Sequence, residues 1–297
     1  MKIIVTGSLG NISLPLATAL VQQGHAVTVI SSQPDRQAAI EVLGATAAIG
    51  SFEDVGFLAA TFVGADALYA MVAGGYGEPD SRAYFQRIGR HYAQAIQQAR
   101  VPRVVHLSSW GAHRDHGTGG ILGSHDVEEI LAAVPGLSLT HLRPTSFYTN
   151  YFSFVGMIKA AGFMGANCAN DRRVALVHPR DIAAAAAEEL TNPAAPASRT
   201  IRYVASDERT PDEVAHALGT AIGRPDLRWV AFTDEQMRAN LIQNGLPAST
   251  AADIVDIYAS MNSGALGEDY EQHKPTLGQV KLEDFAQEFA AAFKQQD

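Results

Sequence analysis

The strongest constraint on the fold is the alternation of short apolar strands with longer amphipathic segments in the first half of the chain. Runs rich in apolar and β-branched residues predict strands at 2–5, 25–30, 46–49, 67–72, 104–107 and 137–142. The segments between them have helical periodicity, and Ile12, Leu16 and Leu20 recur every fourth residue before Gly24. This alternation is typical of a parallel sheet covered by helices. We therefore predict an α/β, Rossmann-type doubly wound fold.

The pattern changes after Arg143-Pro144, where an aromatic segment leads into a loop of small residues at 162–169. Strands at 174–177 and 200–204, with a helix at 179–190 between them, could rejoin the first sheet or form a smaller second one. Beyond residue 211 we expect helices at 211–223, 234–245, 249–262 and 281–294, a strand near 227–232 and a loop over 262–278. The predicted domains are thus a Rossmann domain over 1–150, to which 174–204 could return, and a smaller, mostly helical α/β substrate region over 151–297.

Composition excludes several classes of function. The chain has 22 Lys and Arg against 31 Asp and Glu, without a basic cluster, which disfavours direct binding to nucleic acid. The single cysteine, Cys168, allows no internal disulfide and completes no recognisable zinc pattern, so no metal site is predicted. No apolar stretch approaches the length of a membrane helix, and no secretion signal is recognisable. We expect a cytoplasmic protein that acts on a small molecule; its oligomeric state stays open, a homodimer included.

A glycine-rich turn follows the first predicted strand and precedes the first helix. In Thr6-Gly7-Ser8-Leu9-Gly10-Asn11-Ile12-Ser13, Gly7 would permit the tight turn and Gly10 the close approach of a diphosphate. Amide groups at the start of a helix attract negative charge. The spacing is GxxGxxS rather than GxGxxG, with Ser13 at the third small position. The turn therefore predicts a dinucleotide site formed by Gly7, Ser8, Leu9, Gly10, Asn11 and Ile12, although a glycine turn can also merely reverse the chain.

The end of the second strand decides which dinucleotide is expected. The sequence there is Ile30-Ser31-Ser32-Gln33, without the acidic residue that binds the ribose of NAD. Ser31, Ser32 and Arg36 could instead donate to a 2′-phosphate, which favours NADP(H) over NAD. The alternative is that Asp35 accepts from the ribose, but Pro34-Asp35 is also typical of a helix start. Further cofactor contacts are expected where later strands end, at Ser51, Val72, Ala73, Gly74 and Ser108.

The sequence resembles a known family. The turn at 6–13, the strand segment 104–112 and the motif Leu139-Thr140-His141-Leu142-Arg143-Pro144, followed by Phe147 and Asn150, are similar to the NmrA-like branch of the atypical short-chain dehydrogenases. Segments 178–183 and 212–214 extend the resemblance over nearly the whole chain. That branch includes NADPH-dependent quinone reductases and NmrA, a transcriptional co-regulator that senses the dinucleotide. The resemblance implies the Rossmann fold and NAD(P) binding, with Pro144 and Phe147 at the cofactor.

The usual catalytic pair of short-chain dehydrogenases, YxxxK, is replaced. At that spacing after the fifth strand stand Ile121 and His125. His125 is similar to the histidine or lysine that NmrA-like reductases place at this helix start, where it would bind the nicotinamide ribose or supply a proton. The alternative is a solvent-facing histidine with Ser124 or Asp126 as a cap. The candidate catalytic residues are His125 and Tyr76.

An aromatic set indicates the kind of substrate. Trp110, Tyr148 and Tyr151 are the predicted substrate residues, and a flat apolar molecule would suit them, although each could equally be part of the core. Quinones and other conjugated carbonyl compounds need no strong general acid after hydride transfer. The sequence therefore favours an NADPH-dependent reductase of such compounds. The alternative is a non-catalytic NAD(P) sensor that acts through a regulatory protein partner.

Overall fold

One parallel sheet of seven strands positions the glycine turn. In sequence order its strands are β1 (Lys2–Val5), β2 (Ala26–Ser31), β3 (Thr46–Ile49), β4 (Ala67–Ala70), β5 (Arg103–Leu107), β6 (Ser138–Pro144) and β10 (Arg199–Val204). Their order across the sheet is β10-β6-β5-β4-β1-β2-β3. Starting at β1, the chain moves outward to β3, returns, and continues through β4 to β6. This is the strand order of the doubly wound Rossmann fold, which confirms the predicted fold class.

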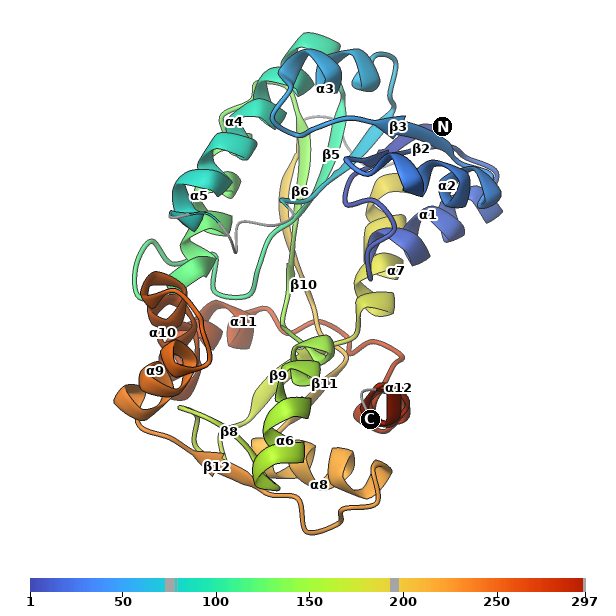
Figure 1. The fold of residues 1–297 in the computed structure, drawn as a ribbon. Coiled ribbons are helices and arrows are strands. Elements are labelled where there is room, and N and C mark those ends of the chain that lie inside the picture. The colour runs from blue at the N-terminus through green and yellow to red at the C-terminus, as the bar shows by residue number, and fades with distance from the viewer. Residues whose placement is uncertain (73–77, 79, 193–197, 296–297) are drawn as a thin grey trace. The chain divides into compact units, whose positions relative to one another are not determined.

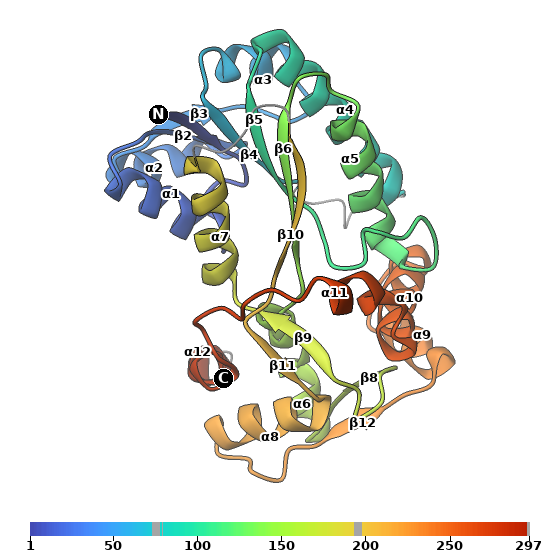
Figure 2. The ribbon, with the colours of Figure 1, turned by 180° about the vertical axis from the view of Figure 1, so that it is seen from behind.

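The computed structural model describes residues 1–72, 78, 80–192 and 198–295. Within them the sheet is covered on both faces, by α1 (Ser13–Gln22), α2 (Gln37–Val42) and α7 (Pro179–Thr191) on one side and by α3 (Val55–Phe62), α4 (Ser81–Ala99) and α5 (Leu122–Ala132) on the other (Figures 1 and 2). The amphipathic stripe of α4 buries Ile88, Tyr92 and Ile96 in the core cluster against strand residues such as Ile4 and Val104. Burial on both faces explains why these strands read as continuous apolar runs.

The chain divides into two compact units. Unit 1 comprises Met1–Ala112, Leu122–Arg143 and Ile182–Arg202, and unit 2 comprises His113–Ile121, Pro144–Asp181 and Tyr203–Asp297. Unit 1 holds the glycine turn and most of the large sheet. Residues 113–121, directly before α5, belong to unit 2, although the chain on both sides of them belongs to unit 1.

Unit 2 contains two small sheets and several helices. A three-stranded sheet has the order β11-β9-β7, and a two-stranded sheet pairs β12 with β8. The strands are β7 (Ser146–Phe147), β8 (Met164–Ala166), β9 (Val174–Val177), β11 (Asp207–Arg209) and β12 (Trp229–Ala231). The helices are η2 (Gly119–Ile121), η3 (Tyr148–Phe154), α6 (Val155–Ala161), α8 (Pro211–Ala221), α9 (Asp234–Gln243), α10 (Ala248–Ser263), η4 (Ala265–Gly267), α11 (Glu268–Gln272) and α12 (Leu282–Gln295).

Of the two later strands predicted from the sequence, one rejoins the large sheet and the other is part of a smaller sheet. β10 lies beside β6 in the large sheet, whereas β9 pairs with β7 and β11 in a second one. The amide of Leu139 donates to the carbonyl of Ser198, and the amide of Thr145 donates to the carbonyl of Val204. Donor and acceptor thus advance in the same direction along β6 and β10, so the two strands are parallel.

The expected loop over 262–278 is wrong in part, because the chain forms η4 and α11 there. These elements are too short to show a periodicity in sequence. Tyr270 explains why α11 forms: its ring packs edge-on against Tyr203 with centroids 5.5 Å apart, and its hydroxyl donates to Glu208 over 2.9 Å. In the part of the chain that the structure describes, no helix is long and apolar enough to cross a membrane. No group of three or more His, Cys, Asp or Glu among these residues could hold a metal ion.

Candidate functional site

The turn between β1 and α1 has the backbone geometry that its glycines predict. Gly7 has φ +89°, and a Cβ on it would lie 2.4 Å from Met71 Sδ and 2.6 Å from Ser13 Oγ. The amide of Gly10 donates to the carbonyl of Gly7 over 3.1 Å, which closes the turn. A side chain at position 7 is therefore excluded both by backbone conformation and by space.

Ser13 shows how the unusual third position of the motif is accommodated. Its side chain is buried, and its hydroxyl donates to the carbonyl of Thr6 over 2.7 Å, which ties the start of α1 to the end of β1. At the N-cap of α1, Ile12 provides no side-chain hydrogen bond to the helix within the described residues. In the first turn of α1 the amides of Leu14 and Leu16 donate to the carbonyls of Gly10 and Ile12 over 2.9 and 3.0 Å, and Pro15 has no amide hydrogen. The preceding turn is therefore the part of the backbone that can offer amides to an anion.

A surface pocket of about 280 Å³ lies between the turn and the end of β2. Its lining residues in the described chain are Gly7, Ser8, Leu9, Gly10, Ile30, Ser31, Ser32, Gln33, Arg36 and Phe52. The structure thus brings most of the predicted turn together with Ser31, Ser32 and Arg36. Of the other turn residues, Asn11 is exposed and Ile12 is buried beneath the turn. Asp35, the alternative ribose acceptor, lies in a 3-10 turn at Pro34–Arg36 and is not one of these lining residues.

Hydrogen bonds give the serines of this pocket different roles. Ser31 is buried, and its Oγ accepts from Ser8 Oγ at 2.9 Å and from the amide of Gln33 at 3.1 Å. Ser32 is exposed, and Arg36 is an exposed cation whose Nε donates to Gln33 Oε1 over 3.1 Å. Ser31 therefore shapes the pocket, whereas Ser32 and Arg36 are accessible to a ligand. Among the described lining residues there is one cation and no carboxylate, so an anion meets no like-charge repulsion.

The residues expected at the ends of the other strands divide into three groups. Ser51 is exposed, with its hydroxyl accepting from the amide of Glu53, and Val72 packs against the core cluster. Ala73, Gly74 and Tyr76 lie outside the described residues. Ser108 is buried, and its hydroxyl donates to the carboxylate of Glu128.

Glu128 belongs to a buried network that the sequence analysis did not identify. Its two carboxylate oxygens accept from Arg143 Nε at 2.9 Å and Nη2 at 2.7 Å, and both side chains are more than nine-tenths buried. The only sequence signal is a glutamate on the apolar stripe of α5, between Val127 and Leu131. An acid in that position needs a buried partner.

His125 lies in the first turn of α5 and is partly buried. Its Nδ1 lies 2.9 Å from the carbonyl of Ala112, which can only accept, so Nδ1 carries a proton. In the neutral ring, Nε2 is then an acceptor. The alternative was a solvent-facing histidine with Ser124 or Asp126 as a cap, and of these two residues Asp126 is bound elsewhere. Asp126 accepts from Arg82 over 2.6 and 2.8 Å, and this pairing lowers the pKa of its carboxyl.

The predicted aromatic residues differ in their surroundings. Trp110 is buried in unit 1, and Pro144, Phe147, Tyr148 and Tyr151 belong to unit 2. Phe147 is partly buried in β7 and Pro144 is buried at the end of β6. Tyr148 is completely buried and stacks on Phe285 of α12, with ring centroids 5.1 Å apart. For Tyr148 the geometry therefore supports the alternative of a core residue.

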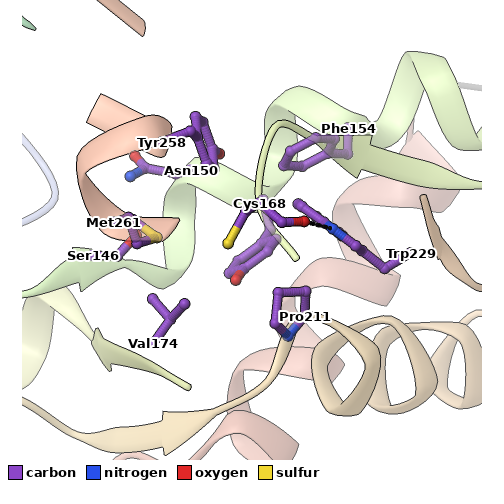
Figure 3. A pocket seen from close by; sticks show the side chains of 10 residues that line it. Ser146, Asn150, Phe154, Cys168, Val174, Pro211, Trp229, Tyr258 and Met261 are labelled. Atoms are coloured by element: carbon purple, nitrogen blue, oxygen red, sulfur yellow. Dashed lines mark hydrogen bonds between the residues drawn. The ribbon is translucent and has the colours of Figure 1, made fainter. Parts of the chain in front are cut away.

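Tyr151 lines a small pocket within unit 2 (Figure 3). Cys168 points into this pocket, and its carbonyl accepts from Trp229 Nε1 over 2.9 Å. The free volume of about 10 Å³ is close to what one water molecule needs, so an aromatic substrate has no room there. Burial raises the pKa of Cys168 to about 11, which disfavours the reactive thiolate at neutral pH.

Comparison with known proteins agrees with this geometry. Residues 7–193 match the family of NAD(P)H-binding proteins. A relative in Streptomyces griseus, a (4-alkanoyl-5-oxo-2,5-dihydrofuran-3-yl)methyl phosphate reductase, is 28% identical over 223 residues, 75% of this chain and 74% of that protein. An NAD(P)H azoreductase of Xenophilus azovorans is 31% identical over 126 residues, 42% of each chain.

Solved structures share the fold over almost the whole chain. An NADPH-dependent quinone oxidoreductase of Escherichia coli, complexed with NADPH, superimposes with a TM-score of 0.78 at 19% identity, covering 96% of this chain and 99% of that one. A triphenylmethane reductase of a Citrobacter species gives 0.79 at 18%, covering 97% and 100%. At these identities the likenesses show the fold alone. The matched family segment begins at Gly7, the first glycine of the turn described above, and the chain belongs to the NAD(P)H-binding family.

Proposed function

We propose that the protein is an NADPH-dependent reductase that transfers a hydride to a quinone-like, enone or other conjugated carbonyl compound. The observation that carries this proposal is the pocket beside the glycine turn, where Arg36 and Ser32 are accessible and no described lining residue is acidic. That surface suits a 2′-phosphate better than the bare ribose of NAD(H). The two curated relatives above are reductases, which supports the class of reaction.

The residues of unit 1 fit the proposed cofactor. The amides of Ser8 and Gly10 already donate to the carbonyls of Ile30 and Gly7, so the other amides of the 7–12 turn would hold the diphosphate. Arg36 with Ser32 would hold the 2′-phosphate. When bound, the nicotinamide supplies the hydride, and the protein supplies orientation and exclusion of water.

His125 is the residue that we assign to the nicotinamide end. Because Nδ1 donates to the carbonyl of Ala112, Nε2 can accept from a ribose hydroxyl. When the ring is protonated, Nε2 can instead deliver a proton. A conjugated acceptor that receives a hydride becomes an enolate or hydroquinone anion. It then takes its proton from imidazolium or from water, so no stronger acid is required.

Nucleotide oxidation tests the proposal directly. Purified protein is mixed with NADPH or NADH and a panel of quinones, enones, aldehydes and azo dyes, and the loss of absorbance of the reduced nucleotide is followed. We expect turnover with at least one conjugated acceptor and a preference for NADPH. Binding of NADPH without turnover on any acceptor would instead support the sensor. No binding of either nucleotide would overturn both.

Two variants test the assigned residues. Arg36→Ala should weaken NADPH binding by about tenfold and leave NADH binding unchanged, since only the former loses a charged hydrogen bond. His125→Ala should lower kcat by about tenfold or more without abolishing the binding of NADPH. His216→Ala, which alters an exposed histidine of α8, is the matched control. A His125→Ala protein with the kcat of the wild type would remove His125 from the site.

A further inference from the structure

The arginine of the nucleotide pocket is held by one neighbour. An arginine side chain has several rotatable bonds, and a ligand that must first order them loses affinity. In this pocket Arg36 Nε donates to Gln33 Oε1 over 3.1 Å, and the amide of Arg36 donates to the carbonyl of Gln33, also over 3.1 Å. The side chain and the backbone of Gln33 thus hold the same residue, although both residues are exposed.

Gln33 is itself fixed to the end of β2. Its amide donates to Ser31 Oγ over 3.1 Å, and the same Oγ accepts from Ser8 Oγ at 2.9 Å. Ser31 is buried at the end of the strand, so its hydroxyl is a well-defined anchor. Pro34 follows at the start of the 3-10 turn, where its ring restricts φ. A chain of hydrogen bonds therefore connects Ser8 of the glycine turn with Arg36 through Ser31 and Gln33.

The bond to Gln33 determines which part of the guanidinium a ligand can use. Of the N–H donors of an arginine, one is on Nε and the others are on the two Nη atoms. No other acceptor among the described residues binds the side chain of Arg36, so its Nη groups are available to a phosphate. The side chain of Gln33 is a neutral amide and adds no charge. A phosphate at the Nη atoms therefore meets an oriented cation and no repulsion from residue 33.

We infer that Gln33 is the positioning residue that makes this pocket select NADPH over NADH. It acts through Arg36, whose guanidinium it orients toward the 2′-phosphate, a group that NADH lacks. The inference rests on the proposed function, in which Arg36 binds that phosphate. It adds that the selectivity depends on the neutral residue that holds the cation as well as on the cation itself.

Removal of the side-chain acceptor tests the inference. Gln33→Leu has nearly the same size but cannot accept from Arg36, and because residue 33 is exposed the substitution leaves the core unchanged. We expect the Kd of NADPH to rise about fivefold and that of NADH to stay the same, as measured by isothermal titration calorimetry. Gln98→Leu, which alters an exposed glutamine in the last turn of α4, is the matched control. Equal Kd values of NADPH in the two variants would overturn the inference.

Gln33→Glu tests the part played by charge. Glutamate keeps an acceptor for Arg36 Nε but places a carboxylate beside the phosphate site. We expect the Kd of NADPH to rise by at least about tenfold, more than in Gln33→Leu, with the binding of NADH unchanged. Gln98→Glu adds the same charge at a residue that is not among the described lining residues, and it should bind both nucleotides as the wild type does. A Kd of NADPH no higher in Gln33→Glu than in Gln98→Glu would contradict the inference.

A double-mutant cycle shows whether Gln33 acts through Arg36. Adding Gln33→Leu to Arg36→Ala should weaken NADPH binding no further, because no guanidinium remains to be oriented. An additional loss as large as that of Gln33→Leu in the wild-type background would mean that Gln33 acts on the nucleotide directly, and the positioning role would be wrong.

Two shorter nucleotides separate the inference from the proposed function. Adenosine 2′,5′-bisphosphate and adenosine 5′-monophosphate differ only in the 2′-phosphate and contain no nicotinamide, so the result does not depend on turnover. The wild type should bind the bisphosphate more tightly, and Gln33→Leu should lose most of that difference. If the wild type binds both equally, the proposed preference for NADPH fails and the inference fails with it. If the wild type prefers the bisphosphate and Gln33→Leu keeps the full preference, only the inference is wrong.

Discussion

Gly7 is the single residue on which the geometry of the turn depends most. Its φ is positive, and Met71 and Ser13 fill the space where a side chain would begin. Alanine there would adopt a left-handed conformation at a cost of about 1–2 kcal/mol and would also push against the start of α1.

We predict that Gly7→Ala weakens NADPH binding by about tenfold or more, because the amides of the turn no longer converge on the diphosphate. Isothermal titration calorimetry measures the change. Gly64→Ala is the matched control, since Gly64 also has positive φ, +69°, but open space around it. Equal Kd values for Gly7→Ala and Gly64→Ala would contradict the assignment of the turn.

Between elements, the buried pair of Glu128 and Arg143 joins α5 to β6. We predict that Glu128→Ala lowers the free energy of unfolding by about 3–5 kcal/mol, because it leaves Arg143 charged and buried without its partner. Glu188→Ala removes an exposed partner of Arg202 and should cost less than about 1 kcal/mol. Urea denaturation followed by circular dichroism measures both. A loss for Glu128→Ala no larger than that for Glu188→Ala would show that the pair does not stabilise the fold.

The strands β5 and β6 also bring His106 and His141 together, with their Nδ1 atoms 3.0 Å apart. Burial lowers the pKa of both rings below the ordinary 6.5 of histidine, and in His106 the neighbouring His141 lowers it further. The unfolded chain therefore binds protons more readily than the folded one. The free energy of unfolding should keep the contribution of this pair above pH 6.5 and lose it progressively below.

Urea midpoints measured from about pH 8 to about pH 5 test this dependence. The double variant His106→Gln, His141→Gln should show a flatter decline, since neither side chain titrates. An equal decline in the double variant and the wild type would assign the acid sensitivity to other groups.

Elements of ordinary length could be predicted from the sequence almost to the residue. The strand expected at 2–5 is β1, and the helix expected at 179–190 is α7, because periodicity and capping residues act locally. The short α11 and the three-residue β8 and β11 could not be predicted, because their stability comes from contacts with distant residues. The glycine motif and the end of the second strand are local in sequence, so they located the turn and Arg36. The bonds of Glu128 to Ser108 and Arg143 join residues far apart in sequence, and nothing in the sequence indicated them.

At the scale of the whole molecule, nucleotide binding should protect defined parts of the chain from hydrogen exchange. With NADPH at about 100 times its Kd, the folded state gains about 2.7 kcal/mol. We predict slower exchange in peptides covering 7–12 and 31–36 of unit 1. Helix α8 serves as an internal control. Protection spread evenly over both units would argue against a site at the turn.

The division of the chain into units shows a further limit of sequence reasoning. The change of pattern after Pro144 is visible in the sequence, but the sequence leaves the return of 182–202 to unit 1 as one of two alternatives and does not indicate that 113–121 belongs to unit 2. Both depend on which surfaces pack together in three dimensions, and hydrophobic periodicity does not specify the partner of an apolar face.

The position of β10 has a practical consequence for anyone who wishes to produce the nucleotide-binding part alone. This strand comes late in the chain but completes the sheet beside β6. A truncated protein that stops at residue 150 would leave β6 as a bare edge with unsatisfied backbone groups, which invites aggregation. A minimal fragment would have to be made by deletion and splicing, with a designed linker from Arg143 to Pro179 that retains α7 and β10.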